Sequence, residues 1–436
     1  MGPMTVMQRA NHLQQHPQRA VLHNEVHARP PQALSAPLAL SHVVMACDAT
    51  QREASRAHIA ALLRDHHLPL PDPLSSHFRM DLGAFHLRWE LHTEFVSWSF
   101  HTSLAGAQPG ALEPARALDA VPQDWFANLP GQCLSSLHLW VLPGDGPHGA
   151  ALVRQVLLED TLVASSVAGG GAEVFTDFAI HADGFSRMVL LAGQLSPRRL
   201  GRLVQRLLEI ETYRMAALLG LPAAREVSQI LASAERELAE LASAIRSATT
   251  IDEPMLLDRL TKLAGQVESQ HATTHARFSA STAYFELVDK RIHDIRETAL
   301  PGMQTIGEFM ERRLSPARST CEWAARRQDA LSQRVSRISN LLRTRVEIEQ
   351  QQSSQALLAT MNQRQDIQIK LQSTVEGLSV AAITYYIVGL ISYLAKGASR
   401  LGWPWSAEST AAVAIPLVAL GVWWSLRRLH HKVFKG

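Results

Sequence analysis

The segment LHNEVHARP places two imidazoles and a carboxylate at alternate positions near the start of the chain, at His23, Glu25 and His27. In an extended backbone alternate side chains face the same way, and such a set suits a divalent metal ion. Prolines at 30–31 favour the extended form where the segment ends. A structural alternative is a buried clamp between Glu25 and Arg29, with the histidines donating to backbone carbonyl groups. The spacing leaves a metal or ligand site, direct catalysis and this clamp open.

A second polar row, Arg88, Glu90, His92 and Glu94, follows one face of a predicted strand in RWELHTEF. Such a row is typical of a solvated face or an ion-pair ladder, and we keep His92 and Glu94 as candidate ligands. The glycine triplet at 169–171 lacks a following Lys-Ser/Thr, so it predicts no phosphate loop. No Ser-His-Asp or Cys-His arrangement follows from spacing, and therefore no enzyme class is indicated.

The composition excludes several classes of protein. The 42 Lys and Arg residues balance 40 Asp and Glu residues, so no global field marks a nucleic-acid-binding protein. The three cysteines lie far apart without a CxxC pair, which excludes a disulfide framework and a thiolate zinc site. The first twenty residues contain no apolar core of a signal peptide. We therefore expect a chain in a reducing compartment, with no cleaved secretory signal.

Two segments near the C-terminus, 377–395 and 409–426, contain no charged residue. As helices they would extend about 27–29 Å, which matches a hydrocarbon core of about 30 Å. The pattern predicts two transmembrane helices and membrane lipid as a partner.

Basic residues predict how these helices are oriented. Six Lys and Arg residues flank their outer ends, four of them in the tail 427–436, whereas the connecting loop 396–408 contains only Lys396 and Arg400. Because cytoplasmic flanks carry the basic excess, we expect both termini in the cytosol and the protein in a bacterial inner membrane.

The chain before the spans divides into three predicted parts. Residues 1–195 alternate in short runs typical of strands and predict a cytosolic α+β domain with a mostly antiparallel or mixed sheet. Residues 196–315 read as a helical domain, broken at Pro301-Gly302. Residues 316–376 predict a long stalk helix, because 317–376 contain neither Gly nor Pro. The predicted strands are 38–46, 78–82, 85–92, 94–101, 133–142, 162–167, 173–180 and 187–192, and the predicted helices among them are 50–66 and 122–128.

The stalk carries an apolar stripe with helical spacing, Leu331, Val335, Ile338 and Leu342. A helix this long needs partners, and we expect the stripe to associate between copies of the chain. Nine arginines lie between positions 312 and 345, and they favour ion pairs with neighbouring helices over a phosphate or nucleotide site.

Several strings together resemble a known family: LHNEVHARP, RWELHTEF, GRLVQRLLEIETYRMAALLGLP, PGMQTIGEFMERRLSPARSTC and EGLSVAAITYYIVGLISYLAKG. They are similar to the bacterial family of uncharacterised membrane-anchored proteins designated domain of unknown function 3422. The resemblance spans nearly the whole chain and implies membrane attachment, without an activity.

The order of elements also resembles CorA-type divalent-metal channels, homopentamers in which a long helix enters the first span. That resemblance implies a homo-oligomer, possibly a pentamer, with a CorA-like architecture. The chain reads ISYLAKG where that family has Gly-Met-Asn, and the loop has Lys396 and Arg400 in place of acids. The candidate pore-lining residues are Ser379, Thr384, Tyr386 and Tyr393.

Two functions follow as hypotheses. The first is a homo-oligomeric CorA-like ion channel or transporter, which the hydroxyl groups of the first span favour, since an anchor needs few of them. The second is a membrane-anchored ligand-sensing or regulatory protein, in which the spans only tether the cytosolic domain. A divalent metal is the cofactor that the histidine segment suggests, and an enzyme is the least supported class.

Overall fold

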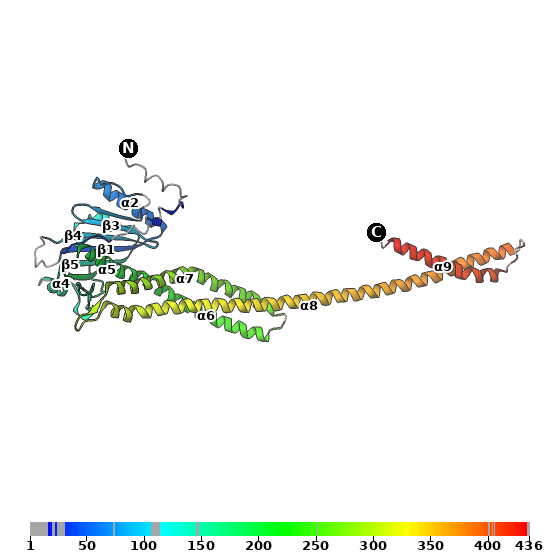
Figure 1. The fold of residues 1–436 in the computed structure, drawn as a ribbon. Helices are drawn as coiled ribbons and strands as arrows, with labels where there is room; N and C mark the ends of the chain where they lie inside the picture. Colours follow the sequence, from blue (N-terminus) through cyan, green and yellow to red (C-terminus); the bar gives the residue numbers. More distant parts are fainter. Residues whose placement is uncertain are drawn as a thin grey trace, which may run out of the picture. The chain divides into compact units, whose positions relative to one another are not determined.

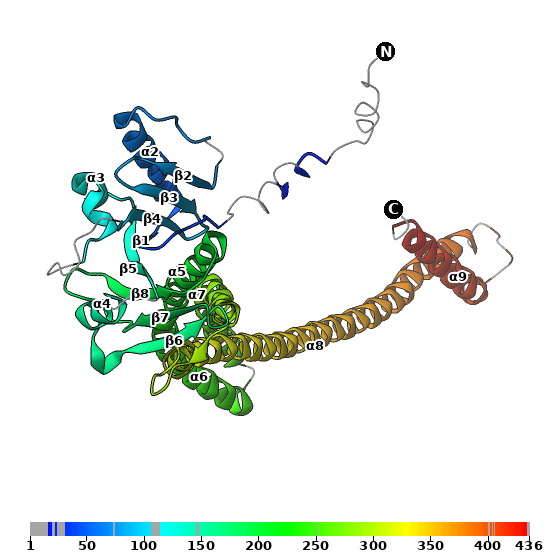
Figure 2. The same cartoon turned by 60° about the vertical axis from the view of Figure 1, so that its left-hand side comes forward.

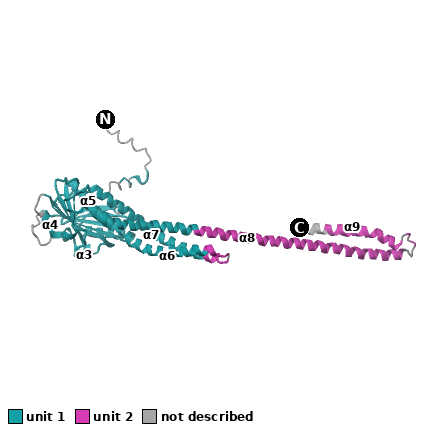
Figure 3. Cartoon of the chain, turned by 90° about the horizontal axis from the view of Figure 1, so that it is seen from below, with its two compact units in different colours: residues 1–244, 258–337 teal, residues 245–257, 338–436 magenta. Residues whose placement is uncertain are grey.

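The computed structural model describes residues 16–19, 22–23, 31–72, 75–105, 114–144, 148–249, 251–399, 402, 404 and 406–433. The chain divides into two compact units (Figure 3). Residues 1–244 and 258–337 form the first, which we call the sheet unit, and residues 245–257 and 338–436 form the second, the hairpin unit.

A mixed sheet is the centre of the sheet unit (Figure 1). Its order among the described residues is β2-β3-β4-β1-β5-β8-β7-β6-β9, and every neighbouring pair is antiparallel except β5 with β8. All eight predicted strands are present; the two residues of β9 are too few to leave an alternating pattern. The strands are β1 Leu38–Ala46, β2 His77–Asp81, β3 His86–Leu91, β4 Phe95–Ser103, β5 Gln132–Pro143, β6 Val163–Val167, β7 Ala172–Thr176, β8 Ser186–Ala192 and β9 Thr298–Ala299.

One face of this sheet is apolar and carries helix α2, Ala49–Asp65 (Figure 2). Three tryptophans, Trp89, Trp98 and Trp140, are fully buried there. Asp48 starts α2 with a capping box, because its carboxylate accepts from the backbone N–H of Gln51 at 2.8 Å and the Gln51 side chain accepts in return. The shorter helices of this unit are η1 Ala117–Ala120, α3 Gln123–Ala127, α4 His148–Val156 and η2 Glu159–Thr161.

Helix α5, Pro197–Leu218, crosses the opposite face of the sheet, and three longer helices follow it in the chain. They are α6 Gly220–Ser247, α7 Glu253–Ile295 and α8 Ile306–Ser399. Helix α6 buries a stripe that steps by three and four residues: Ala224, Val227, Leu231, Ala234, Leu238 and Leu241. The sequence therefore predicted the α+β part and the large helical part that follows it.

Most of the apolar stripe of α8 is buried within a single chain. Leu331, Val335 and Leu342 are each at most 2% exposed, and Ile338 is half-buried, so association between copies of the chain stays a prediction. In the sheet unit α8 contacts α6 through the ion pair of Arg327 with Glu235, and α7 through a hydrogen bond of 3.0 Å between Thr274 and Gln328. Neighbouring helices of the same chain therefore cover most of the residues that we expected to join separate copies.

Helix α8 also runs through the position where we expected a new element to begin. Pro316 lies inside the helix, although proline removes a backbone donor and costs about 3 kcal/mol in a helix interior. A buried stripe continues across it: Met310, Leu314, Ala317 and Cys321. Burial of these side chains offsets the proline, and one helix replaces the expected short helix and separate stalk.

The expectation of ion pairs from the arginines of α8 is confirmed at three positions. Arg318 and Arg327 pair with acids on α7 and α6, and Arg345 pairs with Glu253 at 2.7 Å within the hairpin unit. The Glu253 side chain is only 1% exposed, so the guanidinium compensates a buried carboxylate.

The hairpin unit contains the end of α8 and helix α9, Ala407–Val433. From residue 350 to 375 every side chain of α8 is exposed, including Leu358, Met361 and Leu371. Within α8 and α9, one stretch of each is long and apolar enough to cross a membrane, and these stretches are only 11% and 6% buried. The two predicted spans are thus present as exposed apolar helices.

Candidate functional site

Polar side chains gather on the face of the sheet that α5 covers. Arg88 and Glu90 of β3 alternate with apolar residues of the opposite face, and the register pairs Arg88 with Ser99 and Glu90 with Ser97 on β4. Ser99 in turn pairs with His42 on β1. Because the central strand contributes two small serines, a hollow remains between the larger side chains on either side.

Helices α5 and α7 close this hollow. Residues 205, 208, 209, 212 and 213 share one face of α5, and Arg291 reaches in from α7. The cavity measures about 240 Å³ and is partly open to solvent. We call it the polar cavity; its lining residues are His42, Arg88, Glu90, His92, Phe95, Ser97, Ser99, Gln205, Leu208, Glu209, Thr212, Tyr213 and Arg291.

His42 lies at the centre of the lining and is 4% exposed. Its Nδ1 is 2.8 Å from the Ser99 hydroxyl and its Nε2 is 3.0 Å from the Thr212 hydroxyl. Because Thr212 donates its own proton to the carbonyl of Leu208, its oxygen accepts from Nε2–H, and Nδ1 accepts from Ser99. Burial lowers the pKa of His42 to about 4, so this imidazole is neutral at pH 7.

Two ion pairs supply the charge of the polar cavity. Arg88 donates to Glu90 at 2.7 Å, and both side chains are about one-tenth exposed. Arg291 pairs with Glu209, whose other oxygen accepts from Gln205 at 2.9 Å. The Nε of Arg88 is buried without a hydrogen-bond acceptor. The lining therefore offers guanidinium and carboxylate groups in equal number, together with one unused donor, which suits a small molecule that carries both charges.

The two candidate ligands of the second polar row, His92 and Glu94, lie in different surroundings. His92 lines the polar cavity and stacks on Phe95, with ring centroids 4.3 Å apart. Glu94 does not line it; its carboxylate pairs with Arg277 of α7 through two contacts of 3.1 Å. Burial and the adjacent Glu94 carboxylate raise the pKa of Tyr284. The row is thus neither solvated nor a single ladder, because α5 and α7 cover it.

The other sequence candidates contribute less to a site. Glu25, His27 and Arg29 lie outside the described residues, and His23 is exposed. Across the described ranges no group of three or more His, Cys, Asp or Glu side chains is arranged to hold a metal ion. The choice between a metal site and a clamp in this segment therefore stays a prediction.

In the first apolar helix, hydroxyl groups have partners within the helix itself. Ser379 donates to the carbonyl of Val375, and Thr384 donates to that of Val380. Tyr386 and Tyr393 are 75% and 78% exposed. Thr384, Tyr386 and Tyr393 line a hollow of about 690 Å³ beside α9, within the hairpin unit.

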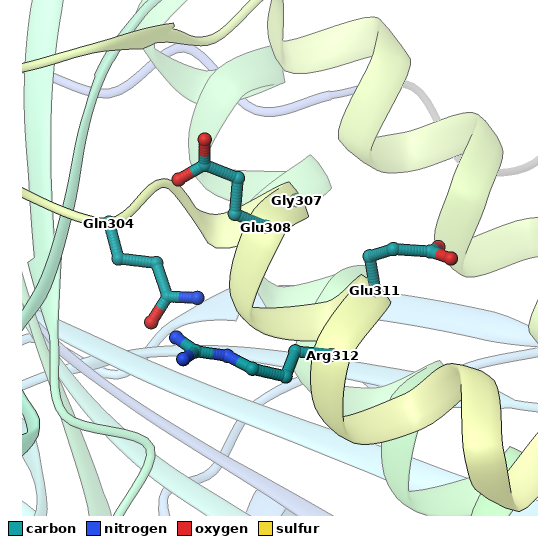
Figure 4. Close-up of a pocket in the computed structure, with 5 residues that line it drawn as sticks. All are labelled: Gln304, Gly307, Glu308, Glu311 and Arg312. Atoms are coloured by element: carbon teal, nitrogen blue, oxygen red, sulfur yellow. The ribbon is translucent and has the colours of Figure 1, made fainter.

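A further hollow opens beside the first turns of α8 (Figure 4). Gln304 and Arg312 point toward one another there, while Glu311 points away. Glu308 is engaged in capping the helix, since it accepts from the backbone of Thr305 at 3.0 Å and donates its own N–H to the Thr305 hydroxyl. We therefore assign the side chains around this hollow to the N-terminal cap of α8 and not to a binding site.

The histidine, arginine and glutamate residues of the polar cavity come from β1, from β3 and the turn after it, from α5 and from α7. Sequence reasoning found only those of β3, because spacing along one strand is visible in a sequence. The signal for α5 was its helical apolar face interrupted by Glu209 and Thr212, and no signal identified Arg291.

Fold and site together define a class of protein: an α+β unit with a polar cavity, followed by two helices that could cross a membrane. Within that class, the chain belongs to a family described as protein of unknown function (DUF3422), whose family model matches residues 14–433. Neither the comparison with curated proteins nor the comparison with solved structures finds a match.

Proposed function

We propose that this protein is a membrane-anchored ligand-binding protein whose sheet unit takes up a small amphoteric molecule in the polar cavity. The observation that carries the proposal is the lining of paired guanidinium and carboxylate groups, with Arg88 Nε left without an acceptor. A molecule with an anionic and a cationic group can satisfy both, whereas a buried polar atom without a partner costs free energy.

The anchor in this proposal is the pair of apolar helices, which cross a bacterial inner membrane. Both termini and the sheet unit then lie in the cytosol. The excess of basic residues at the outer ends of the two spans supports this orientation. The proposal assigns no catalytic role to the lining, including the Ser99 hydroxyl that donates to His42.

A thermal-unfolding screen of the full chain in detergent tests the proposal. Free amino acids serve as the zwitterionic probes, and a ligand should raise Tm by mass action as its concentration exceeds Kd. Ser97→Leu fills the floor of the polar cavity and should abolish the shift, whereas Ser103→Leu, exposed at the end of the same strand, should retain it. No shift with any probe, or an equal shift in both variants, would refute the proposed site.

The CorA-like channel is a second candidate, and one observation favours it. Tyr393 lies in an apolar helix, is 78% exposed and has no hydrogen-bond partner among the described residues. In lipid such a hydroxyl needs a partner, which a second copy of the chain would supply. The hydroxyls of Ser379 and Thr384 do not add to this argument, because their own helix satisfies them.

The channel candidate predicts a closed oligomer, possibly a pentamer, and ion flux. The mass of the detergent-solubilised protein measures the first, and cation flux into liposomes measures the second. Neutralising Lys396 and Arg400 should raise the flux, since both charges repel an arriving cation. A monomer without flux would leave the anchored ligand-binding protein alone.

A further inference from the structure

Basic side chains also line a second hollow of the sheet unit, separate from the polar cavity. It measures about 330 Å³ and lies beside the N-terminal half of α5 and the C-terminal end of α7. Ala168, in the turn between β6 and β7, forms part of its wall and donates to the carbonyl of Ile295 at 2.7 Å. We call its cationic residues the basic cluster: Arg199, Arg202, Arg206, His293 and Arg296.

Most of these guanidinium groups have unused hydrogen-bonding capacity. Among the residues that the structure describes, the side chains of Arg199, Arg202 and Arg296 are exposed and have neither a hydrogen-bond nor an ion-pair partner. Arg206 donates one bond of 3.0 Å, to the backbone carbonyl of Asp294. The carboxylate of Asp294 is the one acid in the lining, and Arg291 already binds it at 3.3 Å. The hollow is therefore strongly positive, in contrast to the balanced polar cavity.

At Arg199 and Arg296, arginine stabilises the local backbone less than other residue types would. Arg199 lies in the first turn of α5, where the positive end of the helix dipole favours acids, and this turn contains none. The side chain of Ser196 does not cap the helix. Arg296 follows α7 with a φ of 51°, a left-handed conformation that favours glycine. Residues that break local rules in this way are expected at functional sites.

We propose that the basic cluster binds the phosphate groups of a polyanionic ligand. Guanidinium groups bind phosphate oxygens through paired hydrogen bonds, and three of them are unoccupied here. Arg199 and Arg206 are seven residues apart on α5, about 10 Å along the helix axis, so the cluster spans more than one phosphate group. The same chemistry belongs to a soluble polyphosphate and to the headgroups of an anionic lipid bilayer.

Thermal unfolding of the full chain in nanodiscs distinguishes these sources. In discs of phosphatidylcholine, inorganic triphosphate should raise Tm if the ligand is soluble. In discs containing phosphatidylglycerol, Tm should be raised without triphosphate if lipid headgroups occupy the cluster. Either stabilisation supports the proposal only if it depends on the arginines of the cluster.

Three variants provide that dependence. If the ligand is soluble, Arg202→Gln should weaken the affinity for triphosphate at least tenfold. If the ligand is lipid, the same variant should lose the rise in Tm that phosphatidylglycerol causes. Arg198→Gln is the matched control, because Arg198 is exposed one turn before Arg202 in α5 and does not line the hollow. Arg296→Gly should raise the basal Tm, since glycine relieves the left-handed conformation, and yet lose binding, which separates a lost ligand contact from a misfolded chain.

The proposal is overturned if neither triphosphate nor phosphatidylglycerol raises Tm. It is also overturned if Arg202→Gln and Arg198→Gln respond alike. Because the amino-acid probes and the Ser97→Leu variant test a different cavity, failure of either proposal leaves the other standing.

Discussion

Acid should destabilise the sheet unit through histidines that are buried in the neutral form. Burial lowers the pKa of His42, His101 and His138 to about 4 each, whereas histidine in an unfolded chain titrates near 6.5. Between these values the unfolded chain binds protons that the folded chain does not. The free energy of unfolding is therefore unaffected above about pH 6.5 and decreases as the pH falls toward 4.

His42 provides the test of this reasoning, because both of its ring nitrogens meet neutral hydroxyl groups, whereas His138 lies 3.8 Å from the Asp183 carboxylate. The charges that face it are Glu90, which raises its pKa, and Arg88 and His92, which lower it. A difference of 2.5 pH units between the folded and unfolded pKa corresponds to about 3 kcal/mol, of which about 2 kcal/mol is lost between pH 7 and pH 5. This is a large fraction of the 5–15 kcal/mol that stabilises a typical domain.

Urea unfolding of the full chain in detergent at pH 7, 6 and 5 measures the effect, with the fluorescence of the buried tryptophans as the signal. His42→Gln removes one titrating group, so its loss of stability between pH 7 and pH 5 should be smaller than that of the unaltered protein by about 2 kcal/mol. His66→Gln, at an exposed position, should keep the original pH dependence. An acid-induced loss in His42→Gln equal to that of the unaltered protein would refute the argument.

Three further predictions concern packing and topology. Gly201→Ala places a Cβ 1.6 Å from the carbonyl oxygen of Gln32 and should lower the free energy of unfolding in urea by about 3 kcal/mol. Gly265→Ala, in open space on α7, should raise that free energy by about 0.5–1 kcal/mol. Leu331→Ala should cost about 2–5 kcal/mol, whereas Leu341→Ala, 73% exposed on the same helix, should be nearly neutral in the same assay. A reporter that is active only in the periplasm should be inactive when fused to the C-terminus.

Each of these predictions has a contrary outcome. Equal effects within the glycine pair would mean that the contact of α5 with residues 31–34 is absent. Equal effects within the leucine pair would mean that the stripe of α8 is not covered by its own chain. An active C-terminal reporter would reverse the proposed orientation.

The sequence predicted elements better than it predicted their contacts. Alternation located β1 to the residue, and the Ser196-Pro197 start of α5 was read correctly, because both patterns are local. The polar cavity depends on β4 lying between β1 and β3 and on the docking of α5 and α7. No local pattern predicts the ion pair between Arg291 and Glu209, because these residues are 82 positions apart in the chain.

Pro316 and the apolar stripe of α8 show the same limit. Proline predicts a helix end from local cost alone, yet burial of Leu314 and Ala317 on either side of it exceeds that cost. Leu331 and Val335 have the spacing of a coiled-coil seam, and spacing does not identify whether the partner is another copy or the same chain.

The exposed stretch of α8 also sets the order of events during synthesis. The sheet unit is complete at Arg337, and the first uncharged segment begins about 40 residues later. At 5–20 residues per second, a ribosome needs about 2–8 s to make that stretch. Small mixed α/β domains fold within seconds or faster. On that scale the sheet, whose last strand comes from residues 298–299, has time to close before the first apolar segment is made.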